Sequence, residues 1–151
     1  MSTLRVRLTG TVEIALPPEQ AFTMFTPSGE RTWSHGWDPR FPSPAADETE
    51  PGTVFQTDHG GRESTWIVTR CDHGQSIQYV TTTAGERCGI VTVACEPSAN
   101  GTKATVSYDF TALSHAAEAE LGRFAMGFPS FLGHWESSIA RAMNAARRQA
   151  D

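Results

Sequence analysis

The order of the elements along the chain is the feature that most constrains its fold. Apolar and polar residues alternate over residues 5–16, which predicts a strand with one buried face. Short helices opened by Pro17 and Pro18 follow, then five strands, then a long amphipathic helix. A curved antiparallel sheet whose long helix comes last can place that helix across one face of the sheet. We therefore expect an α+β fold, in which any space left between helix and sheet becomes a pocket.

Turn sequences separate the five strands in the middle of the chain. Gly60-Gly61 is a two-residue hairpin signal, and glycine-containing turns separate the other strands. The predicted strands cover residues 53–59, 62–70, 76–83, 87–96 and 102–113. Together with the first strand they predict an antiparallel sheet of about six or seven strands. Gly10, inside the first strand, is expected to mark a bulge or a bend.

The C-terminal segment, residues 114–150, has a helical pattern with Ser114 as its cap. One straight helix of that length would span roughly 55 Å, more than the diameter of about 40 Å expected for the domain. We therefore expect a break at Pro129. Helical spacing then predicts one buried face on the last piece. Its apolar residues are Phe128, Phe131, Leu132, Trp135, Ile139, Ala142, Met143 and Ala146.

Composition excludes several classes of function. The 151 residues fit a single domain, residues 1–151. The net charge of −5 without a basic cluster argues against nucleic-acid binding, and no apolar run is long enough for membrane insertion. Three cysteines without a C-x-x-C pair favour a cytoplasmic location. The five histidines lack metal-ligand spacing, so we expect no metal and no cofactor.

The loop that follows the first short helices is rich in aromatic residues and prolines. Trp33, His35 and Trp37 lie in this loop and are candidates for the mouth of a pocket, where they would cover an apolar ligand. The alternative is that the tryptophans close the end of the core while His35 faces water. The sequence leaves both open.

Three stretches resemble the START-like superfamily, also called SRPBCC, over nearly the whole chain. They are VEIALPPEQAF at residues 12–22, WIVTRCD with SIQY at 66–72 and 76–79, and GIVTV with GTKATVSY at 89–93 and 101–108. The superfamily includes birch-pollen-allergen-like proteins, polyketide cyclases/dehydrases and ATPase activator homologues. The resemblance implies a helix-grip fold, in which the sheet wraps around the long C-terminal helix and two short helices follow the first strand. It also implies a cavity for an apolar or amphipathic small molecule.

Alternation and the resemblance together suggest which residues face that cavity, although most inward-facing residues of such a sheet are ordinary core and only a subset would line it. The ligand-binding candidates are Trp33, His35, Trp37, Phe55, Trp66, Tyr79, Tyr108, Phe131, Trp135 and Ile139. The buried phenols of Tyr79 and Tyr108 would need hydrogen-bond partners or a ligand. No motif diagnostic of hydrolases, NTPases or dinucleotide binding is present. The weak catalytic candidates are His35, Glu63, Arg87 and His134.

Three functions remain open at this point. The first is binding of a hydrophobic or amphipathic small molecule between sheet and helix, without catalysis. The second is an enzyme of the cyclase/dehydratase type, which would hold a polyketide-like or aromatic substrate in a reactive shape and move a proton with one buried acid or base. The third is a protein-interaction module like the ATPase activator homologues. Each function is compatible with a monomer or a homodimer.

Overall fold

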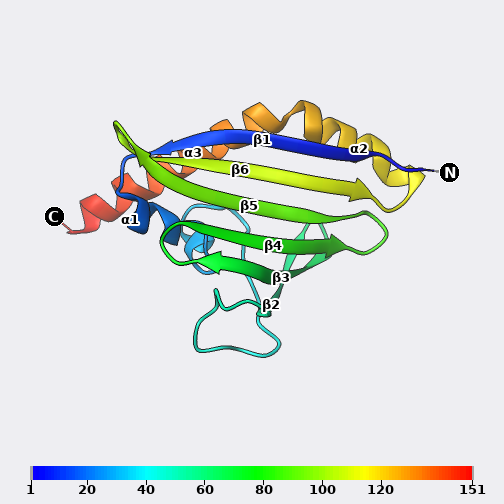
Figure 1. Ribbon diagram of the computed structural model, residues 1–151, viewed down its shortest axis with the longest axis horizontal. Coiled ribbons are helices and arrows are strands. Elements are labelled where there is room, and N and C mark those ends of the chain that lie inside the picture. Colours follow the sequence, from blue (N-terminus) through cyan, green and yellow to red (C-terminus); the bar gives the residue numbers. More distant parts are fainter. Residues whose placement is uncertain (1, 151) are drawn as a thin grey trace.

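The computed structural model describes residues 2–150 and contains one six-stranded antiparallel sheet with helices against it (Figure 1). Its elements are β1 (Arg5–Ile14), α1 (Pro18–Thr23), the 3-10 helix η1 (Gly29–Thr32), β2 (Val54–His59), β3 (Arg62–Asp72), β4 (Ser76–Thr83), β5 (Arg87–Ser98), β6 (Gly101–Ala112), α2 (His115–Met126) and α3 (Phe128–Ala150). The strand order is β1-β6-β5-β4-β3-β2. Strands β2 to β6 pair sequentially as a meander, and β1 forms one edge of the sheet beside β6. The predicted α+β class is confirmed, with six strands.

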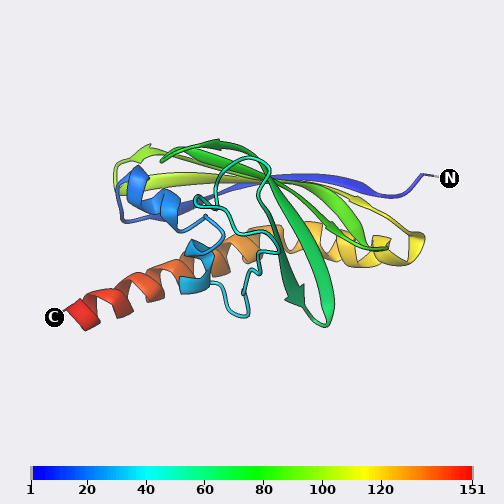
Figure 2. The same cartoon turned by 90° about the horizontal axis from the view of Figure 1, so that it is seen from below.

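Helix α3 runs beneath the sheet, and the β2–β3 hairpin curves down towards the helical layer (Figure 2). The helix buries Phe128, Leu132 and Ile139, one face at the spacing expected of an amphipathic helix. Ala146, at the far end of the predicted stripe, is exposed. This arrangement of a curved sheet around a long C-terminal helix is the helix-grip fold, which confirms the prediction.

The break between the two C-terminal helices lies at Gly127 and not at Pro129. Ser114 caps α2 as expected, because its hydroxyl accepts a hydrogen bond from the backbone N–H of Ala117 at 3.2 Å. Helix α2 ends at Met126 and α3 begins at Phe128. Pro129 therefore occupies the first turn of α3, where a missing backbone N–H breaks no helical hydrogen bond. The prediction of a break at Pro129 was therefore wrong by two residues.

Gly10 does not form a bulge. It pairs with Val106 in a register that continues unbroken along β1 and β6. A Cβ atom at Gly10 would lie 2.5 Å from Cδ1 of Leu132, so the glycine lets α3 approach β1 closely. The register shift of the sheet falls instead in β3, between Val68 and Arg70.

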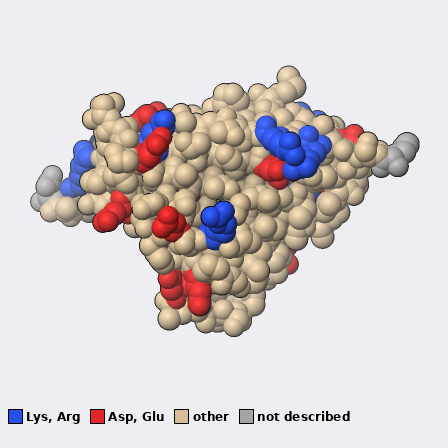
Figure 3. All heavy atoms as spheres, in the orientation of Figure 1, with Lys and Arg blue, Asp and Glu red and all other residues tan. Residues whose placement is uncertain are grey.

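The sheet face seen in Figure 3 carries few charged side chains, and some of its basic residues lie beside acidic ones. Arg5 and Arg7 lie 2.7 Å and 3.7 Å from the Asp109 carboxylate. Lys103 lies 2.9 Å from Glu96. Such exposed pairs contribute little to stability. The cavity lies on the opposite side of the sheet, where the helices pack.

Candidate functional site

A cavity of about 370 Å³ lies between the sheet, the C-terminal helices and the loop of residues 33–37. Its wall carries many aromatic side chains, which come from every layer of the fold, between polar ones. The aromatic side chains are Phe25, Trp33, Trp37, Trp66, Tyr79, Tyr108, Phe110, Phe124, Phe131 and Trp135. Tyr108 is at the centre of this group, because its ring contacts those of Phe124, Phe131 and Trp135 at centroid distances of 5.4, 5.8 and 6.4 Å. The wall therefore suits a ligand with an apolar body.

Most of the predicted ligand-binding residues lie on the cavity wall. Those that line it are Trp33, His35, Trp37, Trp66, Tyr79, Tyr108, Phe131 and Trp135. Phe55 and Ile139 do not: they lie within the core, 0% and 1% exposed, and are not part of the wall. Phe55 stacks against Trp66 with ring centroids 5.8 Å apart, so Trp66 presents its ring to the cavity and Phe55 supports it.

Three of the four weak catalytic candidates also line the cavity, and one does not. His35, Arg87 and His134 line the cavity. Glu63 does not: its carboxylate accepts hydrogen bonds from Arg40 at 3.2 Å and from Gln56 at 3.1 Å. Glu63 therefore holds the loop and the strand edge together and does not face a bound molecule.

The loop tryptophans line the cavity and also close the core. The indole N–H of Trp33 donates to the carbonyl of Met24 at 2.7 Å, and that of Trp37 to the carbonyl of Pro27 at 2.8 Å. Both polar ends are thus occupied by the backbone, and only the ring faces are available to a ligand. Trp33 also packs edge-on against Trp135 of α3, with centroids 5.2 Å apart. His35 between them is exposed.

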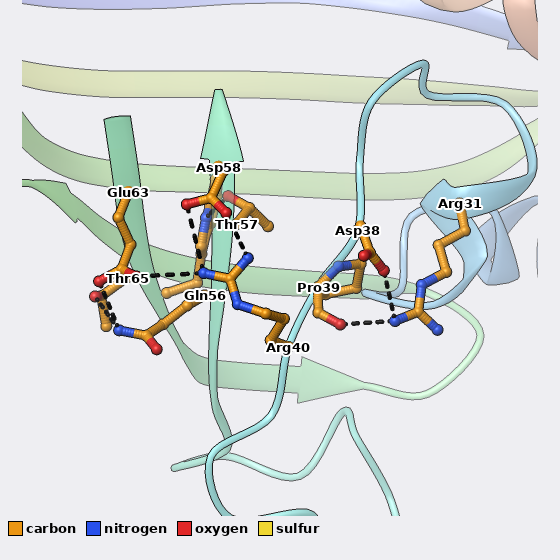
Figure 4. Close-up of polar contacts among 10 residues, drawn as sticks. Arg31, Asp38, Pro39, Arg40, Gln56, Thr57, Asp58, Glu63 and Thr65 are labelled. Carbon is orange, nitrogen blue, oxygen red and sulfur yellow. Dashed lines mark hydrogen bonds and ion pairs between the residues drawn. The ribbon is translucent and has the colours of Figure 1, made fainter. Parts of the chain in front are cut away.

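Two arginines fix this loop to its surroundings (Figure 4). The backbone of Arg40 pairs with the edge strand β2 through hydrogen bonds of 2.9 and 2.8 Å, and its guanidinium reaches Asp58 at 2.7 Å and Glu63 at 3.2 Å. Arg31 donates to the carbonyl of Pro39 at 2.6 Å. The loop therefore covers the otherwise unpaired edge of β2 and forms a fixed side of the cavity.

Two hydroxyls, those of Tyr108 and Thr81, are among the polar groups on the wall that have no protein partner within residues 2–150. The hydroxyl of Tyr79 donates to the carbonyl of Phe25 at 2.8 Å, but that of Tyr108 has no corresponding bond. The hydroxyl of Thr81 is buried and also unpaired. Burial raises the pKa of Tyr108, so its phenol remains a hydrogen-bond donor at neutral pH. Unpaired groups of this kind are available to the polar end of a ligand.

Glu30 and Arg87 are among the ionisable residues that share the cavity with these hydroxyls. Glu30, in η1, lines it without a hydrogen bond or ion pair to its carboxylate from residues 2–150. Desolvation raises the pKa of Glu30 well above its ordinary value, because the charged form loses water without gaining a partner. Arg87 lines the same cavity from the start of β5. The charges of Glu30 and Arg87 both reach the Tyr108 hydroxyl.

The replacement Glu30→Gln should stabilise the protein at neutral pH and leave its stability at pH 4 nearly unchanged. A carboxyl with a raised folded-state pKa favours the folded protein below its unfolded pKa, near 4.5. That contribution is lost as the pH rises towards the folded-state pKa. Thermal melts at both pH values should therefore show a Tm gain of a few degrees for Glu30→Gln only at the higher pH. The exposed Glu50→Gln is the control, and an equal gain at both pH values would contradict the assignment.

Among the wall residues that sequence reasoning missed are Glu30 and Thr81. Thr81 could have been found, because it continues the inward alternation of Ile77 and Tyr79 along β4. Glu30 could not, since η1 is a short 3-10 turn without periodicity. The direction of the Glu30 side chain depends on how closely the preceding residue, Gly29, packs against α1. A Cβ atom at Gly29 would lie 1.7 Å from the backbone oxygen of Thr23.

Two further features are absent from the part of the chain that the structure describes. Over residues 2–150, no His, Cys, Asp or Glu side chains gather in threes as a metal site requires. None of the helices in the same range combines the length and apolar character needed to cross a membrane.

Comparison with known proteins gives one family match. Residues 5–138 match the family described as polyketide cyclase / dehydrase and lipid transport. No curated protein matches the chain.

Solved structures with the same fold come from several bacteria. A protein of Rhizobium leguminosarum is 18% identical with a TM-score of 0.68, over 93% of this chain and 97% of that one. CalU16 of Micromonospora echinospora is 14% identical with a TM-score of 0.59, over 96% and 82%. DynU16, a protein in the dynemicin biosynthetic locus, is 18% identical with a TM-score of 0.57, over 88% of this chain and 46% of that one. At these identities the similarity shows the fold alone.

Proposed function

The chain belongs to the polyketide cyclase / dehydrase and lipid transport family, and we propose that it binds a small amphipathic molecule in the cavity between the sheet and α3. The observation that carries the proposal is the composition of the wall. Aromatic rings from sheet, helices and loop surround a space of about 370 Å³. Within that space the hydroxyls of Tyr108 and Thr81 have no partner among residues 2–150.

The size of the cavity supports a ligand of a few fused or linked rings. Ligand pockets commonly enclose about 300–1,000 Å³ and combine an apolar wall with a small number of polar groups. This cavity lies at the lower end of that range. An apolar body would lie against Phe131 and Trp135, and an oxygen of the ligand would accept a hydrogen bond from Tyr108. That arrangement satisfies a polar group that otherwise lacks a protein partner.

Filling the cavity from its floor tests the proposal. N-phenyl-naphthylamine (NPN), a neutral apolar fluorophore, should bind the wild-type protein with increased emission. Thr81→Phe places a ring in the cavity and should weaken NPN binding at least about tenfold, a change of about 1.4 kcal/mol. Thr82→Phe makes the same change on the exposed side of β4 and should leave the affinity unchanged. Equal affinities in the two variants would mean that NPN binds elsewhere.

A second candidate function is proton-transfer catalysis of the cyclase or dehydratase type. The observation that favours it is that the Glu30 carboxyl and the Tyr108 hydroxyl line the same cavity, where the charge of Glu30 acts on the phenol. A carboxyl whose pKa is raised by desolvation is suited to donate a proton to a carbonyl oxygen of a bound substrate. With a polyketide-like substrate, Glu30→Gln should lower kcat by about 100-fold or more and leave NPN affinity intact. Parallel losses of kcat and NPN affinity would indicate a packing role.

A further inference from the structure

Arg87 lies where two hollows of the molecule meet. It lines the aromatic cavity and also a more polar hollow of about 250 Å³ between the β2–β3 turn and α2. Its guanidinium carbon lies 4.9 Å from the centre of the Phe110 ring and 5.2 Å from that of Phe124. These two rings hold the cation against the cavity wall through cation–π contacts.

No carboxylate of residues 2–150 forms an ion pair with Arg87. The charges of Glu86 and Glu120 reach its guanidinium, but both carboxylates are paired with Arg62, at 3.4 and 2.7 Å. Desolvation lowers the pKa of Arg87, because the fold removes water that would stabilise the charge. A partly buried cation without a bonded anion is unfavourable, and an anion carried by a ligand would offset that cost.

The surroundings of Arg87 indicate what kind of anion fits. Phe110, Phe124 and Tyr108 form an aromatic surface beside the guanidinium, which suits a ligand whose apolar body begins directly behind its charged group. Glu86, Glu120 and the Arg62 that they share carry one net negative charge near the same site, which disfavours a doubly charged group such as a phosphate dianion. A singly charged carboxylate or phenolate is therefore the better match.

We propose that Arg87 is the anion-binding residue of the cavity, and that the ligand is an amphipathic organic acid with a ring-bearing apolar body. The carboxylate or phenolate would bind the guanidinium, and the body would extend past Tyr108 towards Phe131 and Trp135. The inference rests on the proposed function, because it assigns the polar end of the molecule that the cavity holds.

Two fluorophores that differ by one anionic group test the inference. Anilinonaphthalene sulfonate (ANS) has the skeleton of NPN with an added sulfonate, which stands in for the ligand anion. Wild-type protein should bind ANS more tightly than NPN. Arg87→Gln should reduce the ratio of ANS affinity to NPN affinity by about tenfold, as expected for a charge-assisted contact that is partly exposed to solvent. Arg87→Lys should keep most of the preference for ANS over NPN, because lysine keeps the positive charge.

The matched control is Arg70→Gln, which removes the same charge from an exposed position on β3 and should leave the ratio unchanged. A wild-type protein that prefers NPN to ANS would overturn the inference, as would an equal ratio in Arg87→Gln and wild type. Either result leaves the proposed function standing, provided that NPN binds and Thr81→Phe weakens it. Failure of NPN to bind the wild type would count against the proposed function itself.

Discussion

Phe55→Ala should lower the free energy of unfolding by about 3–5 kcal/mol, the range measured for large-to-small aromatic substitutions in protein cores. Phe55 is fully buried and lies within a cluster of rings formed by Trp37, Phe41, Trp66 and Tyr79, with centroid distances of 5.6–6.0 Å. Its removal leaves a cavity behind Trp66 that these rings cannot fill without moving. Urea denaturation followed by circular dichroism measures the loss.

Phe41→Ala is the matched control for this prediction. Phe41 packs against the same ring in a tilted arrangement, with centroids 5.6 Å apart, but it lies in the loop and is only half-buried. Its truncation should cost about 1 kcal/mol, close to the average for point mutations. A loss below about 1 kcal/mol for Phe55→Ala, or a loss no larger than that of Phe41→Ala, would show that Phe55 is not a core residue.

Gly29→Ala should destabilise the protein by at least about 2–3 kcal/mol, at the upper end of the usual cost of overpacking. The added Cβ atom would lie 1.7 Å from the backbone oxygen of Thr23. A backbone atom cannot move aside as the end of a flexible side chain can, so α1 and η1 must shift apart. The shift would also displace Glu30, the next residue, from the cavity.

Gly133→Ala is the control, and we expect it to change the free energy of unfolding in the opposite direction. Gly133 is exposed in the middle of α3, and a Cβ atom there would meet nothing within 4 Å. Alanine should stabilise the helix by about 0.5–1 kcal/mol. Chemical denaturation of both variants tests the pair. A Gly29→Ala protein as stable as the wild type would show that α1 and η1 do not pack as described.

The sheet could be predicted well because its signals are local. Strand β4 has the predicted bounds, since alternation and turn residues mark both of its ends. Strands β5 and β6 extend further into their turn than predicted, because Ser98 pairs with Gly101. Backbone pairing can continue through residues that favour turns, and no side-chain pattern shows where it ends.

The site could be predicted only in part, because burial in a cavity depends on contacts between distant segments. Inward alternation identified Trp66, Tyr79 and Tyr108, but the same alternation places Phe55 on the inner face, and only packing shows that Trp66 covers it. Glu63 was a catalytic candidate because carboxylates often transfer protons. In the structure its carboxylate pairs with Arg40, which lies in an irregular loop that the sequence pattern does not place. Arg87 likewise lacks an ion pair only because Glu86 and Glu120 pair with Arg62 instead, and the sequence does not show that choice.

The crystal structure of the protein saturated with NPN is the measurement that tests the central claim most directly. We predict one NPN molecule between the sheet and α3, with its rings against Phe131 and Trp135 and within contact of Tyr108. An NPN molecule bound on the outer face of the sheet, with the cavity unchanged, would contradict it.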